Sequence, residues 1–147
     1  MAVRTAEAEW RGALRDGTGR IRTGSGTLDS AYSFPSRFES GSGTNPEELI
    51  AAAHAGCFSM ALAHGLAGAG HPAERVSTTA KVHLEKADGG FRISRIDLVC
   101  EAEVPGIDEA GFRKQAEDAK ANCPVSKALA GTEITLDAKL ARRTGEA

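Results

Sequence analysis

Two cysteines occupy positions at which a thiol could do chemistry. Cys57 lies in a long uncharged segment, and Cys123 lies directly before Pro124, at the predicted start of a short helix. Unpaired backbone N–H groups and the helix dipole stabilise a thiolate at such a start. If the fold brings Cys57 and Cys123 together, they can cycle between dithiol and disulfide, and the protein would be a thiol-based redox enzyme.

Cys57 needs a cation to become reactive. It is expected about three turns into its helix, beyond the reach of the helix dipole, and burial would raise its pKa. The candidates are Arg37, His54 and His64, and Arg37 is favoured because it is permanently charged and is the only cation in the loop ahead of the helix. Two plainer interpretations stay open, namely that Cys57 is a small buried hydrophobe and that Arg37 is a solvated surface residue.

Glu47 gives a geometric clue. It precedes Cys57 by ten residues, which places it about 15 Å along the helix axis and about 80° around it. It cannot touch the thiol of its own helix, so it either holds Arg37, acts from a second subunit, or only complements the helix dipole. The uncharged helix also needs cover on several sides, and both points favour a homodimer with this helix near the interface.

Other chemistries are less well supported. His54, Cys57 and Cys123 could be metal ligands, but a fourth ligand and any C-x-x-C or H-E-x-x-H pattern are missing. A cysteine hydrolase or acyltransferase with His54 or His64 as base lacks a recognisable orienting partner. A non-catalytic small-ligand-binding stress protein is the third class. No metal and no organic cofactor is expected.

The chain of 147 residues is expected to form a single domain, residues 1–147. Alternating segments and turn residues predict strands, and Asn45, Pro46 and Glu48 predict a helix start. The order indicates an α+β fold with a mostly antiparallel sheet around a long central helix. The expected elements are strands at 6–11, 20–23 and 26–28, a loop at 32–44, a helix from 45 to 65 or 68, strands at 76–86 and 91–104, helices at 108–122 and about 125–130, and a strand at 133–140.

The composition argues against two classes of partner and indicates a cellular compartment. The net charge is −2 and the cations are scattered, which argues against nucleic acid and against an anionic membrane surface. Residues 49–73 carry no charged side chain, but His54 and many alanines and glycines favour a helix buried in protein on nearly all sides over a membrane span. Three cysteines and no signal-peptide pattern predict a cytoplasmic protein, where a disulfide is usually transient.

Six blocks of the sequence resemble the family of OsmC, the osmotically inducible protein C, and the organic hydroperoxide resistance proteins. The resemblance implies a thiol peroxidase that forms an intertwined homodimer with active sites at the subunit interface. By matching position, Cys57 resembles the peroxidatic cysteine, Cys123 the resolving cysteine, and Arg37 and Glu47 the charged residues of the site. His54 suggests the OsmC branch. The blocks are residues 37–39, 43–50, 52–62, 104–108, 123–126 and 133–136.

The resemblance also implies a mechanism. Cys57 would reduce an organic hydroperoxide, and hydrogen peroxide more weakly, and would become a sulfenic acid that condenses with Cys123 to a disulfide. An external dithiol or dithiol protein would then reduce the disulfide. Cys100 falls outside this chemistry. An apolar pocket that would favour organic hydroperoxides is expected from Phe34, Phe38, Phe58 and Met60.

Overall fold

The computed structural model describes residues 2–141, which divide into two compact units. The first unit ends at Leu49 and the second begins at Ile50. Each unit is described by itself below. The assignment of the whole chain to one domain stays a prediction.

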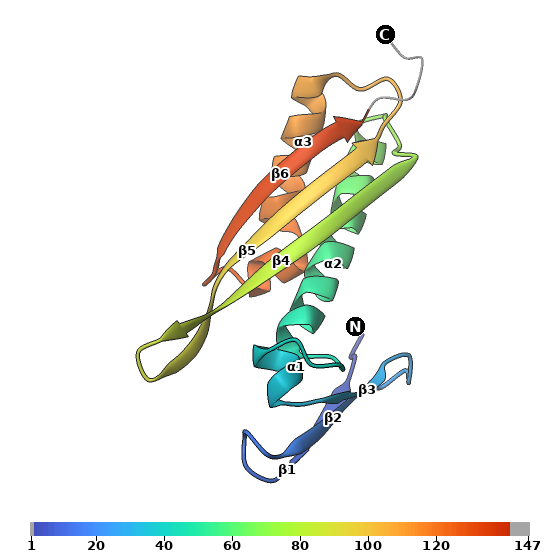
Figure 1. Ribbon diagram of the computed structural model, residues 1–147. Helices are drawn as coiled ribbons and strands as arrows, with labels where there is room; N and C mark the ends of the chain where they lie inside the picture. Colours follow the sequence, from blue (N-terminus) through green and yellow to red (C-terminus); the bar gives the residue numbers. More distant parts are fainter. Residues whose placement is uncertain (1, 142–147) are drawn as a thin grey trace. The chain divides into compact units, whose positions relative to one another are not determined.

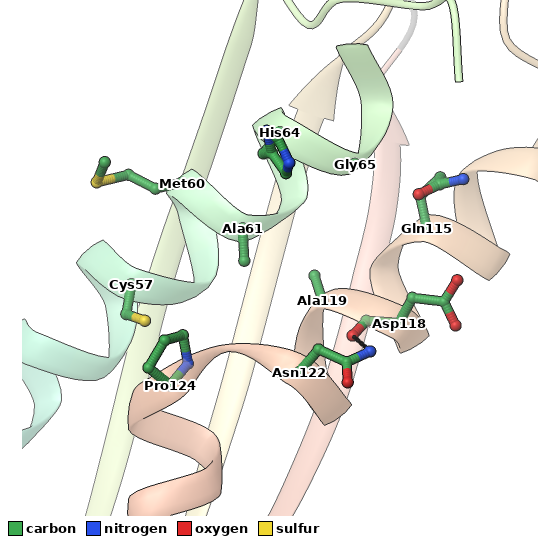
Figure 2. Close-up of a pocket in the computed structure, with 10 residues that line it drawn as sticks. All are labelled: Cys57, Met60, Ala61, His64, Gly65, Gln115, Asp118, Ala119, Asn122 and Pro124. Atoms are coloured by element: carbon green, nitrogen blue, oxygen red, sulfur yellow. Dashed lines mark hydrogen bonds between the residues drawn. The ribbon is translucent and has the colours of Figure 1, made fainter. Parts of the chain in front are cut away.

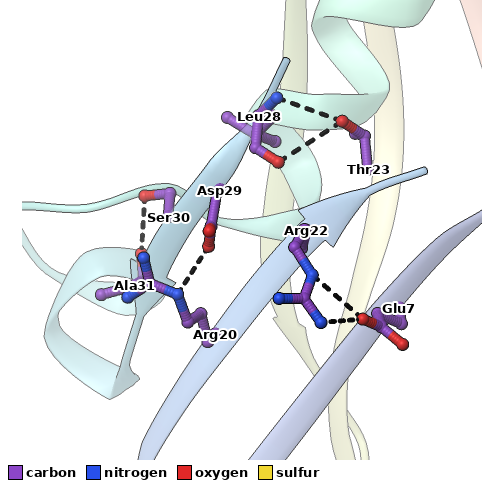
Figure 3. Close-up of polar contacts among 8 residues, drawn as sticks. All are labelled: Glu7, Arg20, Arg22, Thr23, Leu28, Asp29, Ser30 and Ala31. Carbon is purple, nitrogen blue, oxygen red and sulfur yellow. Dashed lines mark hydrogen bonds and ion pairs between the residues drawn. The ribbon is translucent and has the colours of Figure 1, made fainter. Parts of the chain in front are cut away.

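The first unit contains a three-stranded antiparallel sheet with the strand order β1-β2-β3. Figure 3 shows ion pairs that join its neighbouring strands, Arg22 with Glu7 and Arg20 with Asp29. The third strand begins at Asp29 rather than at residue 26, because Gly26, with φ of +77°, belongs to the turn before it. The strands are β1 (Ala6–Arg11), β2 (Thr18–Thr23) and β3 (Asp29–Tyr32).

A short helix follows where only a loop was predicted. Helix α1 spans Phe34–Phe38. Ser33 and Ser36 form a reciprocal capping box, in which the Ser33 hydroxyl accepts from the Ser36 N–H at 3.2 Å and the Ser36 hydroxyl accepts from the Ser33 N–H at 2.8 Å. Pro35 in the first turn suits the same start. The prediction of an irregular segment from 32 to 44 is therefore wrong over these residues, and the capping residues were its missed signal.

Helix α2 (Pro46–Gly68) is the long helix that the sequence predicts. The side chain of Asn45 accepts a hydrogen bond from the Glu48 N–H at 2.7 Å, as expected of an N-cap. One stripe of the helix, at four-residue spacing, is completely buried and comprises His54, Phe58, Leu62 and Leu66.

The other faces of α2 are less covered than predicted. Ala52, Ala53, Gly56 and His64 are exposed, and Met60 is 77% exposed. The expectation of burial on nearly all sides is thus wrong for the isolated chain. Length and apolar composition also make α2 the one helix of residues 2–141 that could cross a membrane, although the core helix of a soluble protein meets the same two criteria.

The second unit contains a three-stranded mixed sheet, with the order β4-β5-β6. Strand β4 (Arg75–Ala87) pairs antiparallel with β5 (Gly90–Glu103), but β6 (Glu133–Ala141) runs parallel to β5. A parallel pair requires a crossover, which is supplied here by α3 (Glu109–Asn122) and α4 (Pro124–Ala128). The predicted α+β class is confirmed. The sheet differs from purely antiparallel pairing at one place, the parallel pair of β5 and β6.

Helices α2 and α3 lie on the same face of this sheet (Figure 1). The core of the unit consists of the buried stripe of α2, the inward face of β5 and the apolar side of α3. The predicted alternation of β5 is confirmed, since Ile96, Leu98, Cys100 and Ala102 are all buried. The core residues of α3 are Phe112, Ala116 and Ala119. The site described next lies where α2 meets the junction of α3 and α4.

Candidate functional site

The two predicted thiols meet within the second unit. The Sγ atoms of Cys57 and Cys123 are 2.9 Å apart, and both cysteines are free thiols. Cys57 stands in the middle of α2, whereas Cys123 closes α3 by donating its backbone N–H to the Ala119 carbonyl at 2.9 Å. The sequence expectation that the fold brings the two thiols together is therefore confirmed. A sulfenic acid on either sulfur would have the other within reach.

Cys123 is also the N-cap of α4, as predicted. Its sulfur accepts a hydrogen bond from the Ser126 N–H at 3.5 Å, and its side chain is completely buried. Burial acts to raise the pKa of the Cys123 thiol, but hydrogen bonds from Cys57, from the backbone and hydroxyl of Ser126 and from the backbone of Val125 together lower it below the ordinary value. The immediate surroundings therefore favour the thiolate form at Cys123 more than at Cys57.

The surroundings of Cys57 raise the pKa of its thiol, in contrast to those of Cys123. Burial raises the pKa of the Cys57 thiol, and the contact with Cys123 raises it further, against a smaller lowering by the Val125 backbone. The expectation that burial raises the pKa of Cys57 is confirmed. A group outside this set must lower its pKa if Cys57 is to attack at neutral pH.

Arg37 and Glu47 form a bidentate ion pair within the first unit. Arg37 Nε donates to Glu47 Oε1 and Arg37 Nη2 donates to Glu47 Oε2, both at 3.0 Å. Glu47 is buried, and its bidentate pairing with Arg37 fixes the plane of the guanidinium group. The guanidinium carbon of Arg37 also lies 5.1 Å from the Phe38 ring centroid. Of the alternatives left open for Glu47, the contact with Arg37 is therefore present in the structure. The action of Arg37 on Cys57 stays a prediction, since the two residues belong to different units.

A pocket of about 660 Å³ opens beside Cys57 in the second unit. Figure 2 shows Cys57, Met60 and Ala61 on α2, with Gln115 and Asp118 on α3 at the opposite side of the pocket. The remaining lining residues are His64, Gly65, Ala119, Asn122 and Pro124. The thiol of Cys57 is therefore open to a small molecule, whereas Cys123 is enclosed.

The first unit has its own pocket, of about 320 Å³, which is lined by aromatic side chains and by Arg37. Phe34 and Phe38 line it, whereas Met60 lines the pocket beside Cys57, so a single apolar pocket formed by these residues stays a prediction. Phe58 lines neither. It is completely buried in the core of the second unit, so its assignment to a substrate pocket was wrong, because it falls on the core stripe of α2.

A buried histidine and serine adjoin the thiols and were not paired by sequence reasoning. His54 Nε2 lies 2.8 Å from Ser126 Oγ, and both side chains are buried. Burial lowers the pKa of His54, so the imidazole is neutral at neutral pH. The signal was available in the spacing, because His54 stands three residues before Cys57 and Ser126 three residues after Cys123.

The donor set does not suit a metal ion. His54 uses Nε2 on Ser126, and within residues 2–141 no group of three or more His, Cys, Asp or Glu side chains is arranged to hold a metal. Cys100, the third cysteine, lies in the core, and burial raises its pKa. Cys57 and Cys123 are the two thiols that this site brings into contact.

Comparisons with known proteins give a consistent result. A family model described as OsmC-like protein matches residues 39–139. The chain is 50% identical over 135 residues to the peroxiredoxin OsmC of Escherichia coli (strain K12), covering 91% of this chain and 94% of that one. It is 32% identical over 142 residues to the organic hydroperoxide resistance protein OhrB of Bacillus subtilis (strain 168), covering 95% of this chain and all of that protein.

A solved structure shares the fold. The crystal structure of an organic hydroperoxide resistance protein OsmC from Legionella pneumophila superposes with a TM-score of 0.69 at 26% identity. The match covers 97% of this chain and all of that chain.

Proposed function

Since the chain belongs to the OsmC-like protein family, we propose that Cys57, Cys123, Arg37 and Glu47 carry out its reaction. The protein is a thiol-dependent peroxidase that reduces organic hydroperoxides. The observation that supports the assignment of the thiols is the 2.9 Å separation of the Cys57 and Cys123 sulfurs, in a chain that is 50% identical to a peroxiredoxin.

Cys57 is the peroxidatic cysteine in this proposal. Its thiolate attacks the terminal oxygen of a hydroperoxide, the O–O bond breaks, and the alkoxide leaves and takes up a proton to become the alcohol. Cys57 is assigned this step because it lines the pocket, whereas Cys123 is completely buried. The thiolate of Cys123 then attacks the Cys57 sulfenic acid, and hydroxide leaves as water when it is protonated. The product is a Cys57–Cys123 disulfide.

Arg37 supplies the positive charge that Cys57 lacks in its own surroundings. A permanent cation beside the sulfur would offset the raised pKa of Cys57 and would stabilise the negative charge that develops on the peroxide oxygens. Glu47 holds the Arg37 guanidinium by two hydrogen bonds of 3.0 Å each. Glu47 is therefore a positioning residue in this reaction.

The assembly we propose is an intertwined homodimer with its active sites at the subunit interface. The support is the exposed side of α2, which is apolar and uncharged where a lone soluble chain would carry polar residues. Met60, which is 77% exposed, lies on this side next to the pocket beside Cys57. A second copy of the chain would cover it and would complete the pocket wall.

The preference for organic hydroperoxides over hydrogen peroxide is attributed to the apolar walls of the pockets, which gain from burying an alkyl group. An external dithiol or dithiol protein reduces the disulfide, and the reaction takes place in the cytoplasm, where such reductants are abundant.

Steady-state consumption of an organic hydroperoxide with dithiothreitol as reductant tests the proposal. Cys57→Ser should abolish turnover, whereas Cys123→Ser should keep one stoichiometric oxidation and lose efficient disulfide-based turnover. Cys100→Ala is the matched control, since it removes the one thiol outside the pair. Full turnover by Cys57→Ser would refute the mechanism. A cysteine hydrolase would instead tolerate Cys123→Ser and need no dithiol.

A further inference from the structure

The completely buried imidazole of His54 has no role in the reaction described so far. Its Nε2 is 2.8 Å from Ser126 Oγ, and within residues 2–141 its Nδ1 has no hydrogen-bond partner. A buried polar atom without a partner costs stability, because it loses its hydrogen bond to water on folding. A leucine would extend the apolar stripe of α2 at this position without that cost, so the histidine calls for a functional reason.

The unpartnered Nδ1 determines the direction of the hydrogen bonds. A neutral imidazole carries one N–H, on either Nε2 or Nδ1. A proton on Nδ1 would leave a buried N–H donor unpaired, which is rarer in proteins than an unpaired acceptor. The proton therefore lies on Nε2, and His54 donates to Ser126 Oγ. The hydroxyl proton of Ser126 is then free for another acceptor.

The acceptor within reach is the sulfur of Cys123. The Ser126 backbone N–H is 3.5 Å from Cys123 Sγ, and the Ser126 side chain acts to lower the pKa of the Cys123 thiol. The influences that lower the pKa of Cys123 most are hydrogen bonds, and they act against burial, which raises it. Hydrogen bonds must therefore stabilise this thiolate, and the bond from His54 polarises the Ser126 hydroxyl towards the sulfur.

Exposure determines which sulfur needs this help during the reduction of the disulfide. Cys57 lines the pocket, whereas Cys123 is completely buried, so an external thiolate attacks Cys57. A new S–S bond forms to Cys57, the bond between Cys57 and Cys123 breaks, and its electron pair goes to Cys123, which leaves as a thiolate. The second thiol of the reductant then displaces the Cys57 thiolate, so the reductant leaves as a disulfide and the protein gains two electrons.

We propose that His54 and Ser126 form a hydrogen-bonded pair that stabilises the buried Cys123 thiolate as the leaving group when a dithiol opens the Cys57–Cys123 disulfide. The inference rests on the disulfide proposed above. Ser126 acts directly on the reacting sulfur, and His54 is a positioning residue that acts through Ser126. A thiol with a lower pKa leaves faster, so the pair accelerates the regeneration of the enzyme.

A titration of Cys123 alone tests the pair without any peroxide. In the Cys57→Ser/Cys100→Ala background Cys123 is the remaining thiol, and its thiolate is followed by ultraviolet absorbance against pH. Ser126→Ala should raise the pKa of Cys123 by about one unit, the effect of losing a hydrogen bond to a charged group. His54→Leu should raise it by less, and His54→Gln, whose amide keeps an N–H donor near Nε2, should restore most of the parent value.

Ser59→Ala is the matched control for a lost hydroxyl. Ser59 Oγ is 2.7 Å from Thr78 Oγ1, and Ser59 is not among the largest influences on the pKa of Cys123, so this variant should titrate like the parent. The pair is refuted if Ser126→Ala leaves the titration unchanged. If that variant does not fold by circular dichroism, His54→Leu and His54→Gln decide, and identical titrations of the two would refute the role of His54.

The rate of disulfide opening is the second measurement. In oxidised protein with Cys57 and Cys123 intact, Ser126→Ala should slow reduction by dithiothreitol several-fold, and by more than it changes the rate of sulfenic acid formation at Cys57. Equal slowing of both steps would indicate a general distortion and would contradict the proposal. A shifted titration in that background, together with a wild-type chain that consumes no hydroperoxide, would refute the proposed function and leave the hydrogen-bonded pair intact.

Discussion

The sulfurs of Cys57 and Cys123 lie 2.9 Å apart although 66 residues separate them in the chain. The crossover from β5 through α3 and α4 brings Cys123 back against α2. The two thiols differ in a way that suits a division of labour. Cys57 is open to the pocket and has a raised pKa, whereas Cys123 is enclosed and has a lowered pKa.

The first prediction concerns the cation of the site. Arg37→Ala should raise the pKa of Cys57 by about one unit, because the thiolate loses its positive neighbour. Glu47→Gln should have a smaller effect in the same direction, since it only loosens the guanidinium. The rate of alkylation against pH measures the pKa, in a Cys123→Ser/Cys100→Ala background.

Arg15 offers a matched control for Arg37. Its guanidinium lies 4.8 Å from the centroid of Phe34 in the same unit, without the bidentate carboxylate. Arg15→Ala should leave the alkylation profile of Cys57 unchanged. An unchanged profile in Arg37→Ala would remove Arg37 from the role proposed here.

The second prediction concerns stability against pH. Burial lowers the pKa of His54 in the folded chain below its ordinary value of 6.5. Below that pH the unfolded chain binds a proton that the folded chain does not, so the free energy of unfolding falls as the pH drops from 6.5 towards the folded pKa. In His54→Gln the free energy of unfolding should fall less over this pH range than in the wild type. Urea unfolding at a series of pH values measures the difference.

His71→Gln is the control for that experiment, because His71 lies beyond the end of α2 and is only partly buried. It should keep the pH dependence of the wild type. Parallel stability curves for the wild type and His54→Gln would show that the buried imidazole does not contribute to acid sensitivity.

The third prediction concerns the assembly. Met60→Glu should shift the protein from dimer to monomer in sedimentation velocity, because it places a charge on the apolar side of α2. Ala110→Glu adds the same charge to an exposed position of α3 and should leave the dimer intact. A wild-type chain that sediments as a monomer would contradict the homodimer.

The fourth prediction concerns substrate size. Ala61 lines the pocket beside Cys57, and Ala61→Phe would fill part of that space. The variant should lose about tenfold in kcat/KM for cumene hydroperoxide through lost apolar burial. Hydrogen peroxide is the internal control, since it needs little room. An equal loss for both peroxides would show that the added ring obstructs Cys57 itself, and an unchanged kcat/KM for cumene hydroperoxide would assign the alkyl group to a different pocket.

Much of the fold could be predicted from local patterns. The cap at Asn45 located the start of α2, and the alternation of Ile96, Leu98 and Cys100 identified the buried face of β5. The direction of β6 could not be read in this way, because alternation is the same in a parallel and an antiparallel strand. That direction depends on the path of α3 and α4 across the sheet.

For the site, too, some features could be predicted from the sequence and others could not. The N-cap role of Cys123 and the raised pKa of Cys57 follow from helix geometry and burial, which residue types and spacing reveal. The contact between His54 and Ser126 spans 72 residues and depends on the packing of α2 against α4. Phe58 was misplaced because an apolar helix gives no signal of which side faces the sheet.

The most direct test of the proposed mechanism is to map the thiols after oxidation. Reduced protein is treated with one equivalent of an organic hydroperoxide, free thiols are blocked, and peptides are identified by mass spectrometry. We predict a disulfide between Cys57 and Cys123, with Cys100 recovered as a free thiol. Recovery of Cys57 as a free thiol after the hydroperoxide has been consumed would contradict the mechanism.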